Sequence, residues 1–215
     1  MRCYLRSIIF FVAYLCSLAV FAETCPVEGA GAHNDPTQNI LKNRQTAPTS
    51  YGEMTVGQFR TKFKPNFGTP RRRNGFYQAQ LDEVAPSEKL GVALIGYIQR
   101  AVKQGPEDTN CGDPLRVDFH IWIGSKARAS KVDGTKMRSE AVVVEITPSW
   151  QDKHPTWTIK ALEKLADQGA KVRISGWVMY DPEHPDKLKK TRGTLWEIHP
   201  VTEVEYMESG TWRDL

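Results

Sequence analysis

The stretch AVVVEITPSWQDKHPTWTIKALEKLADQGAKVRISGWVMY, residues 141–180, contains a strand, a helix and a second strand in that order. Its first part is apolar and rich in β-branched residues, and it ends at Pro148, which cannot donate to a β-ladder. Residues 154–171 change to a helical period of apolar positions, and residues 171–180 return to strict alternation. The pattern therefore predicts one helix between two strands.

Three more strands are predicted around this stretch. Residues 89–103 form a long apolar run with two glycines, Gly91 and Gly96, which is typical of a strongly bent strand. Residues 116–124 alternate strictly between apolar and polar side chains. Residues 194–206 form the last strand. The predicted order is therefore three strands, one helix and two strands.

This order predicts a mainly β fold with one helix, an OB-fold-like five-stranded Greek-key barrel (β-β-β-α-β-β). We expect the barrel to span residues 88–207. An N-terminal extension, partly irregular, occupies residues 23–87, and a C-terminal tail occupies residues 208–215. A general α+β sandwich is the alternative.

The first 22 residues have the pattern of a secretory signal peptide. Arg2 and Arg6 precede the apolar run SIIFFVAYLCSLAVF, and Val20-Phe21-Ala22 resembles a cleavage site. A membrane anchor is the alternative, since the run approaches the length that spans a bilayer. We expect cleavage, a periplasmic or extracellular protein, and no stable transmembrane span afterwards.

Cleavage would leave a nearly neutral chain with two cysteines. The formal net charge falls from +4 to +2 when Arg2 and Arg6 are lost, so any electrostatic binding surface must be local. Of the four cysteines, Cys25 and Cys111 remain, and an oxidising compartment favours a disulfide between them. Two free thiols, or a reactive Cys111, are the alternative.

Five stretches of the sequence, taken together, carry a resemblance to a known group of proteins. They are NILKNR (39–44), TNC (109–111), DFHIW (118–122), VVEITP (143–148) and GWVMYDPEHPDKLKKTRGTLWEIHPVTEVE (176–205). In these phrases the chain resembles bacterial exported proteins of uncharacterised function that share an OB-like domain. The resemblance spans most of the predicted mature chain and implies the fold and export, but no activity.

Two of the predicted strands end in Glu-Ile-x-Pro, at Glu145 and at Glu197. We expect each proline to end its strand, because proline cannot donate to a β-ladder. In an OB-fold the third and fifth strands are parallel neighbours, so we also expect the two glutamates to lie on one outer face. Alternation adds further outward side chains from these strands and from the second strand. The expected set on this face is Asp118, His120, Trp122, Glu145, Thr147, Glu197 and His199.

Three hypotheses compete for this face. His120, Glu145, Glu197 and His199 could bind a divalent metal, such as zinc, in a metal-dependent phosphoesterase or nuclease. The face could instead bind a ligand, with Trp122 as a stacking platform. In the third hypothesis the histidines and carboxylates only satisfy one another in a partly buried polar network.

Basic residues in the connection before the last strand extend the ligand-binding hypothesis. Lys189, Lys190 and Arg192 could neutralise phosphates beside the barrel, although solvated charged loops are the usual finding. The leading expectation is therefore a binding module for an anionic polymer, such as nucleic acid or polysaccharide, or for an envelope partner. No catalytic residue and no cofactor are predicted on this reading. The alternatives are the metal-dependent enzyme and a structural envelope protein.

Overall fold

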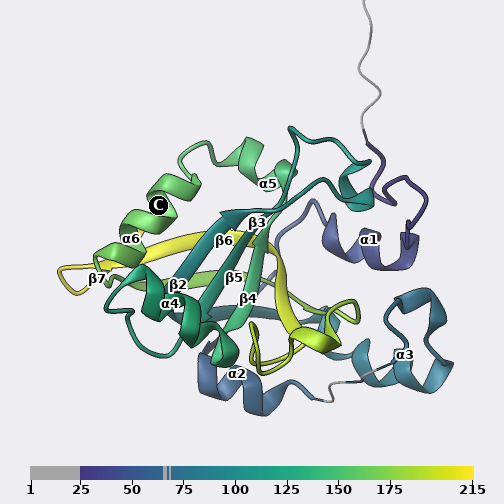
Figure 1. The fold of residues 1–215 in the computed structure, drawn as a ribbon, viewed down its shortest axis with the longest axis horizontal. Helices are drawn as coiled ribbons and strands as arrows, with labels where there is room; N and C mark the ends of the chain where they lie inside the picture. The colour runs from purple at the N-terminus through teal and green to yellow at the C-terminus, as the bar shows by residue number, and fades with distance from the viewer. Residues whose placement is uncertain (1–24, 65–66, 68) are drawn as a thin grey trace, which may run out of the picture.

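Five strands close a mixed β-barrel in the computed structural model, which describes residues 25–64, 67 and 69–215 (Figure 1). The strands pair in the order β2-β3-β4-β6-β5, and β5 pairs back with β2. β4 and β6 are parallel, and the other barrel pairings are antiparallel. The barrel strands are β2 (Gly91–Lys103), β3 (Phe119–Gly124), β4 (Val142–Ile146), β5 (Lys171–Tyr180) and β6 (Trp196–Glu208). The predicted signal peptide lies outside the described residues.

Two short strands extend the barrel sheet. β1 (Gly52–Thr55) lies in the N-terminal extension and pairs in parallel with β2. β7 (Thr211–Asp214) lies in the predicted C-terminal tail and pairs with β6 as a hairpin. The extension and the C-terminal segment therefore each add one strand to the barrel sheet.

The prediction of a single helix is wrong, because the described residues contain six α-helices. The helix expected in residues 154–171 is present over Ile159–Asp167, and a separate short helix, Pro148–Lys153, precedes it. The others are short helices in the extension and in the β3–β4 connection, where polar sequence hid their period. The helices are α1 (Pro36–Lys42), α2 (Val56–Lys62), α3 (Gln78–Val84), α4 (Lys131–Met137), α5 (Pro148–Lys153) and α6 (Ile159–Asp167).

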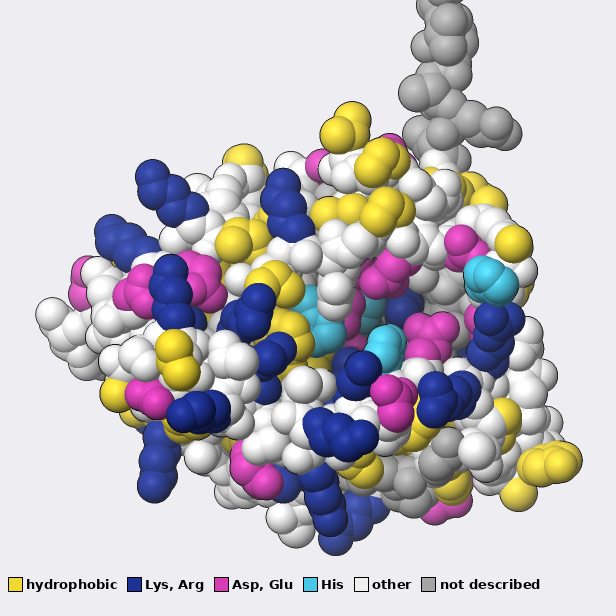
Figure 2. Space-filling model, viewed as in Figure 1, with side chains coloured by type: hydrophobic (Ala, Val, Ile, Leu, Met, Phe, Trp, Pro, Cys, Tyr) yellow, Lys and Arg dark blue, Asp and Glu magenta, His cyan; other side chains and the backbone are white. Residues whose placement is uncertain are grey.

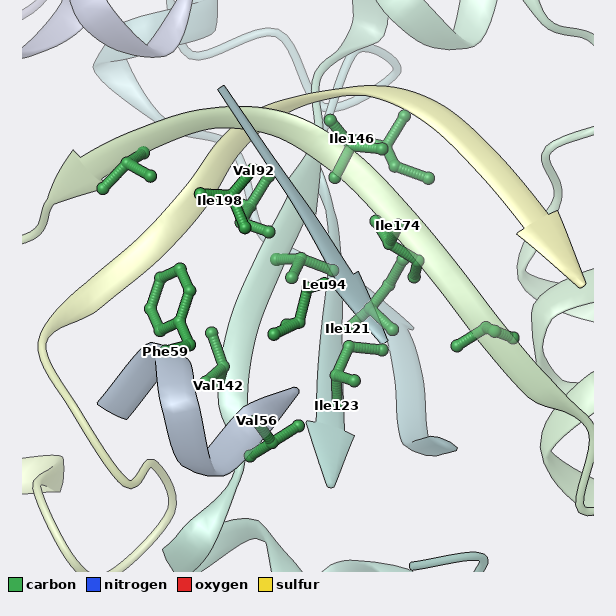
Figure 3. Packing of buried hydrophobic residues seen from close by; sticks show 14 of the residues in the cluster. Val56, Phe59, Val92, Leu94, Ile121, Ile123, Val142, Ile146, Ile174 and Ile198 are labelled. Carbon is green, nitrogen blue, oxygen red and sulfur yellow. The ribbon is translucent and has the colours of Figure 1, made fainter. Parts of the chain in front are cut away.

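The interior of the barrel is filled by aliphatic side chains from all five strands. Figure 3 shows Leu94, Ile121, Val142 and others pointing toward one another, with Phe59 entering from α2. The inward positions expected on β4 and β6, including Ile198, belong to this core. Their alternate residues consequently point to the outer face.

The proline of β6 does not end the strand, contrary to expectation. β6 continues through Pro200 to Glu208, and the His199–Pro200 peptide is cis. The pairing with β5 shifts register here, since Glu203 faces Ser175 but Val201 faces Gly176. A Cβ at Gly176 would lie 2.3 Å from the Pro200 carbonyl oxygen, so only glycine permits this approach. A bulge thus accommodates a proline that a regular ladder would exclude.

The N-terminal extension packs on the barrel and is fixed there. Cys25 and Cys111 form a disulfide that spans a sequence separation of 86 residues. The indole N–H groups of Trp150 and Trp177 donate to the carbonyl oxygens of Arg44 and Thr46, at 2.9 and 2.8 Å. The extension therefore covers part of the barrel surface. No helix in the described part of the chain has the length and apolar character needed to cross a bilayer.

Candidate functional site

Three strands of the barrel place His120, Glu145 and His199 in one row on the outer face. His120 of β3 is the register partner of Glu145 of β4. Val144 of β4 pairs with Ile198 of β6, so the next residues in these parallel strands, Glu145 and His199, are neighbours. The outer cluster that alternation predicts is therefore a consequence of strand register.

The His199 ring lies at the centre of the carboxylates of this face. Its Nδ1 atom is 3.7 Å from an oxygen of Glu145 and 3.7 Å from an oxygen of Glu197. Its Nε2 atom is 3.3 Å from Oδ2 of Asp118. An imidazole therefore lies close to an oxygen of each of the two glutamates.

Several atoms of this cluster are buried without a well-aligned hydrogen bond. Both ring nitrogens of His199, Oδ2 of Asp118 and Nε2 of His120 have no such partner, although the first three are in close electrostatic contact. His199 and Asp118 are both 0% exposed, and His120 is 6% exposed. Asp118 is held by Asn110, whose side-chain amide donates to Oδ1 at 2.7 Å. Such unsatisfied groups are costly unless another species satisfies them.

A second group of polar side chains adjoins the first through Arg192. The Arg192 Nη1 atom donates to Asp181 and to Glu197, both at 2.6 Å. Asp181 also lies 2.9 Å from Nδ1 of His184, whose side chain is 46% exposed. Arg192 therefore joins the barrel face to the loop that follows β5.

The extension and the β2–β3 loop cover the cluster. Nζ of Lys42 in α1 lies 3.5 Å from Glu107 and 3.5 Å from Glu183. Figure 2 shows the result on one face of the molecule, a hollow in which histidine and acidic side chains gather, with basic side chains around it. The site is recessed and is not an open surface.

The recess carries an excess of negative groups. Among the described residues, the lysine and arginine side chains that pair with its carboxylates are those of Lys42 and Arg192. The carboxylates that contact these cations or His199 are Glu107, Asp118, Glu145, Asp181, Glu183 and Glu197. Like charges this close require protons or additional cations between them. The local charge therefore favours a cation over an anion.

Three buried side chains of the cluster have shifted pKa values. Burial and the neighbouring Glu197 raise the pKa of Glu145 well above its usual value. Burial opposes protonation of His199, but its contacts with Asp118 and Glu197 outweigh this and raise its pKa to about 10. Burial and the charge of Arg192 lower the pKa of His120 well below its usual value. These shifts favour an imidazolium at His199 and a neutral imidazole at His120, and they make Glu145 a weaker acid than a free carboxyl group.

Other charges of the recess are fixed by their partners. For Asp181, burial opposes ionisation, but Arg192 and His184 lower its pKa well below the usual value. For Lys42, burial opposes the charged form, but Glu107 and Glu183 raise its pKa well above the usual value. Asp181 and Lys42 are therefore both charged at neutral pH.

The donor atoms of Asp118, Glu145 and His199 can surround a metal ion. One ligand atom from each lies within 4.8 Å of the other two, so some point lies within about 2.8 Å of all three. Zinc–nitrogen and zinc–oxygen bonds are about 2.0–2.2 Å, so each side chain would move by less than about 1 Å. His120, with an unpartnered Nε2, lies beside this group. Imidazole and carboxylate donors suit zinc and related transition metals.

The structure brings together some of the predicted residues and separates others. Asp118, His120, Glu145, Glu197 and His199 converge, but Glu197 contacts Arg192 and His199 and is not one of the three candidate ligands. The remaining predicted residues have other surroundings. The Trp122 ring stacks on His120 at 4.1 Å, Thr147 is buried beside Ser149, and Lys189 and Lys190 are exposed.

Sequence reasoning missed the residues that reach the recess from outside the barrel strands. These come from α1, the β2–β3 loop and the β5–β6 loop, and they are Lys42, Glu107, Asn110, Asp181 and Glu183. The Asp-Pro-Glu-His sequence at 181–184 was the available signal, since polar residues around a proline are typical of an ordered turn.

No protein-family model, curated protein or solved structure matches the chain. The comparisons therefore provide no functional assignment.

Proposed function

We propose that this chain is an exported OB-fold-like protein that binds one divalent transition-metal ion, of the zinc type, through Asp118, Glu145 and His199. The single observation that carries the proposal is the set of buried donor atoms without aligned partners in an acidic recess. A metal ion would satisfy these atoms and bring positive charge into the acidic recess.

The OB-fold assignment is supported by strand order. The barrel strands pair as β2-β3-β4-β6-β5-β2, and α6 lies between β4 and β5 along the chain. This is the connectivity of a five-stranded OB barrel. Export is supported by the N-terminal sequence pattern and by the Cys25–Cys111 disulfide, which suits an oxidising compartment.

Binding of an anionic polymer on this face is less well supported. The residues expected to contact the polymer on the barrel face are buried, with Trp122 only 8% exposed, and carboxylates predominate around them. Of the whole expected set, Lys189 and Lys190 alone are exposed. An extended anionic strand would meet both a steric barrier and like charge.

Metal-dependent phosphoester hydrolysis is the second candidate. It is favoured by the hollow of Figure 2, in which acidic groups lie at the centre and basic groups lie around them. A metal in the recess would polarise a phosphoryl oxygen or lower the pKa of a bound water. Hydrolysis of p-nitrophenyl phosphate after loading with zinc or manganese tests this activity, with Glu145→Gln as the inactive variant.

Elemental analysis of the purified protein tests the metal proposal. We expect about one zinc-type ion per wild-type chain and less than a tenth of that in His199→Ala. His154→Ala is the control, because His154 lies between Trp150 and Trp157, away from the recess, and should leave the metal content unchanged. Wild-type protein that takes up no stoichiometric metal after incubation with zinc would refute the proposal.

A further inference from the structure

A pair of arginines without acidic partners lies beside the candidate metal cluster. The guanidinium of Arg138 lies over the Trp122 ring, with Cζ 4.7 Å from the ring centroid. Arg100 of β2 is the register partner of Trp122, so its side chain projects from the same outer face. Among the described residues, no carboxylate lies within ion-pair distance of either guanidinium.

The position of Arg138 follows from the packing of α4. A Cβ at Gly134 would lie 2.2 Å from the carbonyl oxygen of Gln99, so the absence of a side chain lets α4 contact β2 at its bulge. Residue 138 comes one helical turn after Gly134 and therefore lies on the same side. The fold thus brings two half-buried arginines to one place, although like charges repel each other.

The neighbouring basic residues differ, because they are neutralised. Arg128 contacts Glu163 and Asp167 at 3.0 and 2.5 Å, and Lys131 lies 3.8 Å from Glu163. A cavity of about 370 Å³ lies here, lined by Arg100, Ala101, Val102, Arg128, Lys131, Thr135 and Glu163. Arg138 adjoins the cavity, since its Nε donates to the carbonyl oxygen of Thr135 at 3.1 Å.

We propose that Arg100 and Arg138 form a subsite for a small phosphate-class anion, beside Trp122 and next to the metal cluster. A guanidinium presents parallel N–H donors that match phosphate oxygens, and two of them neutralise a dianion. The subsite connects to the cluster through stacked rings. The ring centroids of His120 and Trp122 lie 4.1 Å apart, and Nδ1 of His120 lies 3.2 Å from Oε1 of Glu145. Arg100 and Arg138 lie outside the candidate metal-ligand group, so the subsite does not require a bound metal.

Phosphate binding by metal-free protein tests the subsite independently of the metal. Protein treated with a chelator is titrated with inorganic phosphate in a calorimeter at low ionic strength. We expect saturable binding that weakens about tenfold in Arg138→Gln and about tenfold in Arg100→Gln. Arg213→Gln is the control, because it removes the same charge from an exposed pair with Glu208 and should change the affinity less than twofold.

Each outcome decides the question. Thermal melting reports whether each variant folds, and Arg138→Lys, which keeps the charge but loses the planar fork, should be intermediate if Arg138→Gln unfolds. Phenyl phosphate, run in parallel, distinguishes an esterified ligand from the free ion. Absence of saturable binding by the wild type, or binding by both arginine variants as tight as that of the wild type, would overturn the proposal. So would an oligonucleotide that binds far more tightly than phosphate with a steep salt dependence.

Discussion

Two groups in the recess have nearly the same composition but different surroundings. The inner group is Asp118, Glu145 and His199, and the outer group is Asp181, Glu183 and His184. Each brings three ligand atoms within 4.8 Å of one another. The inner residues are all buried, and several of their donor atoms lack aligned partners. In the outer group only Asp181 is buried, and no buried side-chain atom of this group lacks a hydrogen-bond partner.

The outer group is satisfied by its own neighbours. Asp181 receives Arg192 and His184 and also accepts from the backbone N–H of Glu183 at 2.9 Å, while Glu183 lies near Lys42. Nothing in it calls for an additional cation. The two groups therefore differ in burial and in unsatisfied donor atoms, and not in ligand types or spacing.

Removing the arginine that joins the two groups should have the largest effect. In Arg192→Met, Asp181 and Glu197 lose the cation that both of them contact at 2.6 Å. Breaking a buried ion pair in this way costs about 3–5 kcal/mol of the free energy of unfolding, which urea denaturation would measure. Arg213→Met, on an exposed pair, should change it by less than about 0.5 kcal/mol. A loss below about 1 kcal/mol in Arg192→Met would show that the groups are not coupled through this residue.

Replacing one histidine from each group should separate them by metal affinity. We expect His199→Ala to weaken zinc binding by about 100-fold or more, since it removes a ligand whose nitrogens have no other aligned partner. His184→Ala should change the zinc affinity by less than about threefold, because the His184 side chain pairs with Asp181 of the outer group. Competition with a chromophoric chelator gives both affinities. The opposite order would assign the metal to the outer group.

A smaller effect on the inner group is expected from Asn110→Ala. Asn110 orients Asp118 through a buried hydrogen bond of 2.7 Å, and loss of such a supporting contact typically weakens metal binding by about tenfold. Asn74→Ala, at an exposed position away from Asp118, is the matched control. Equal zinc affinities in the two variants would mean that Asp118 is not a ligand or needs no support.

The smallest effect concerns the pH dependence of the outer group. The hydrogen bond to Asp181 raises the pKa of His184 despite partial burial, so the folded state binds the proton more tightly than the unfolded state does. This stabilisation is complete below the unfolded pKa of about 6.5 and is lost as the pH rises through the folded pKa. His184→Gln should therefore lower the free energy of unfolding at pH 5.5, by less than about 1 kcal/mol. The loss at pH 9 should be smaller than the loss at pH 5.5. A difference that grows toward pH 9 would contradict the assigned pairing.

The barrel, and the gathering of Asp118, Glu145 and His199 on its outer face, could be predicted from sequence because both depend on local periodicity. The metal set expected on that face was different, namely His120, Glu145, Glu197 and His199. Alternation in 116–124 and 171–180 gave the faces of β3 and β5, and parallel pairing of the third and fifth barrel strands brought Glu145 near His199. Cys25–Cys111 pairing followed from a count of cysteines. These inferences needed only the two-residue period and a known strand order.

The covering elements could not be predicted, because they depend on contacts between distant parts of the chain. Lys42 meets Glu183 across 141 residues, and no local pattern indicates such a pairing. For the same reason Arg192 was interpreted as a ligand-binding residue, whereas it is buried against Asp181 and Glu197. The error over Pro200 arose because a bulge opposite Gly176 is invisible in a strand pattern.

Calorimetric titration of chelator-treated protein with zinc tests the central claim most directly. The account predicts one saturable site per chain that is abolished in Glu145→Gln with His199→Ala and retained in Glu183→Gln with His184→Ala. Absence of a saturable site in the wild type, or equal retention of binding in both double variants, would contradict it.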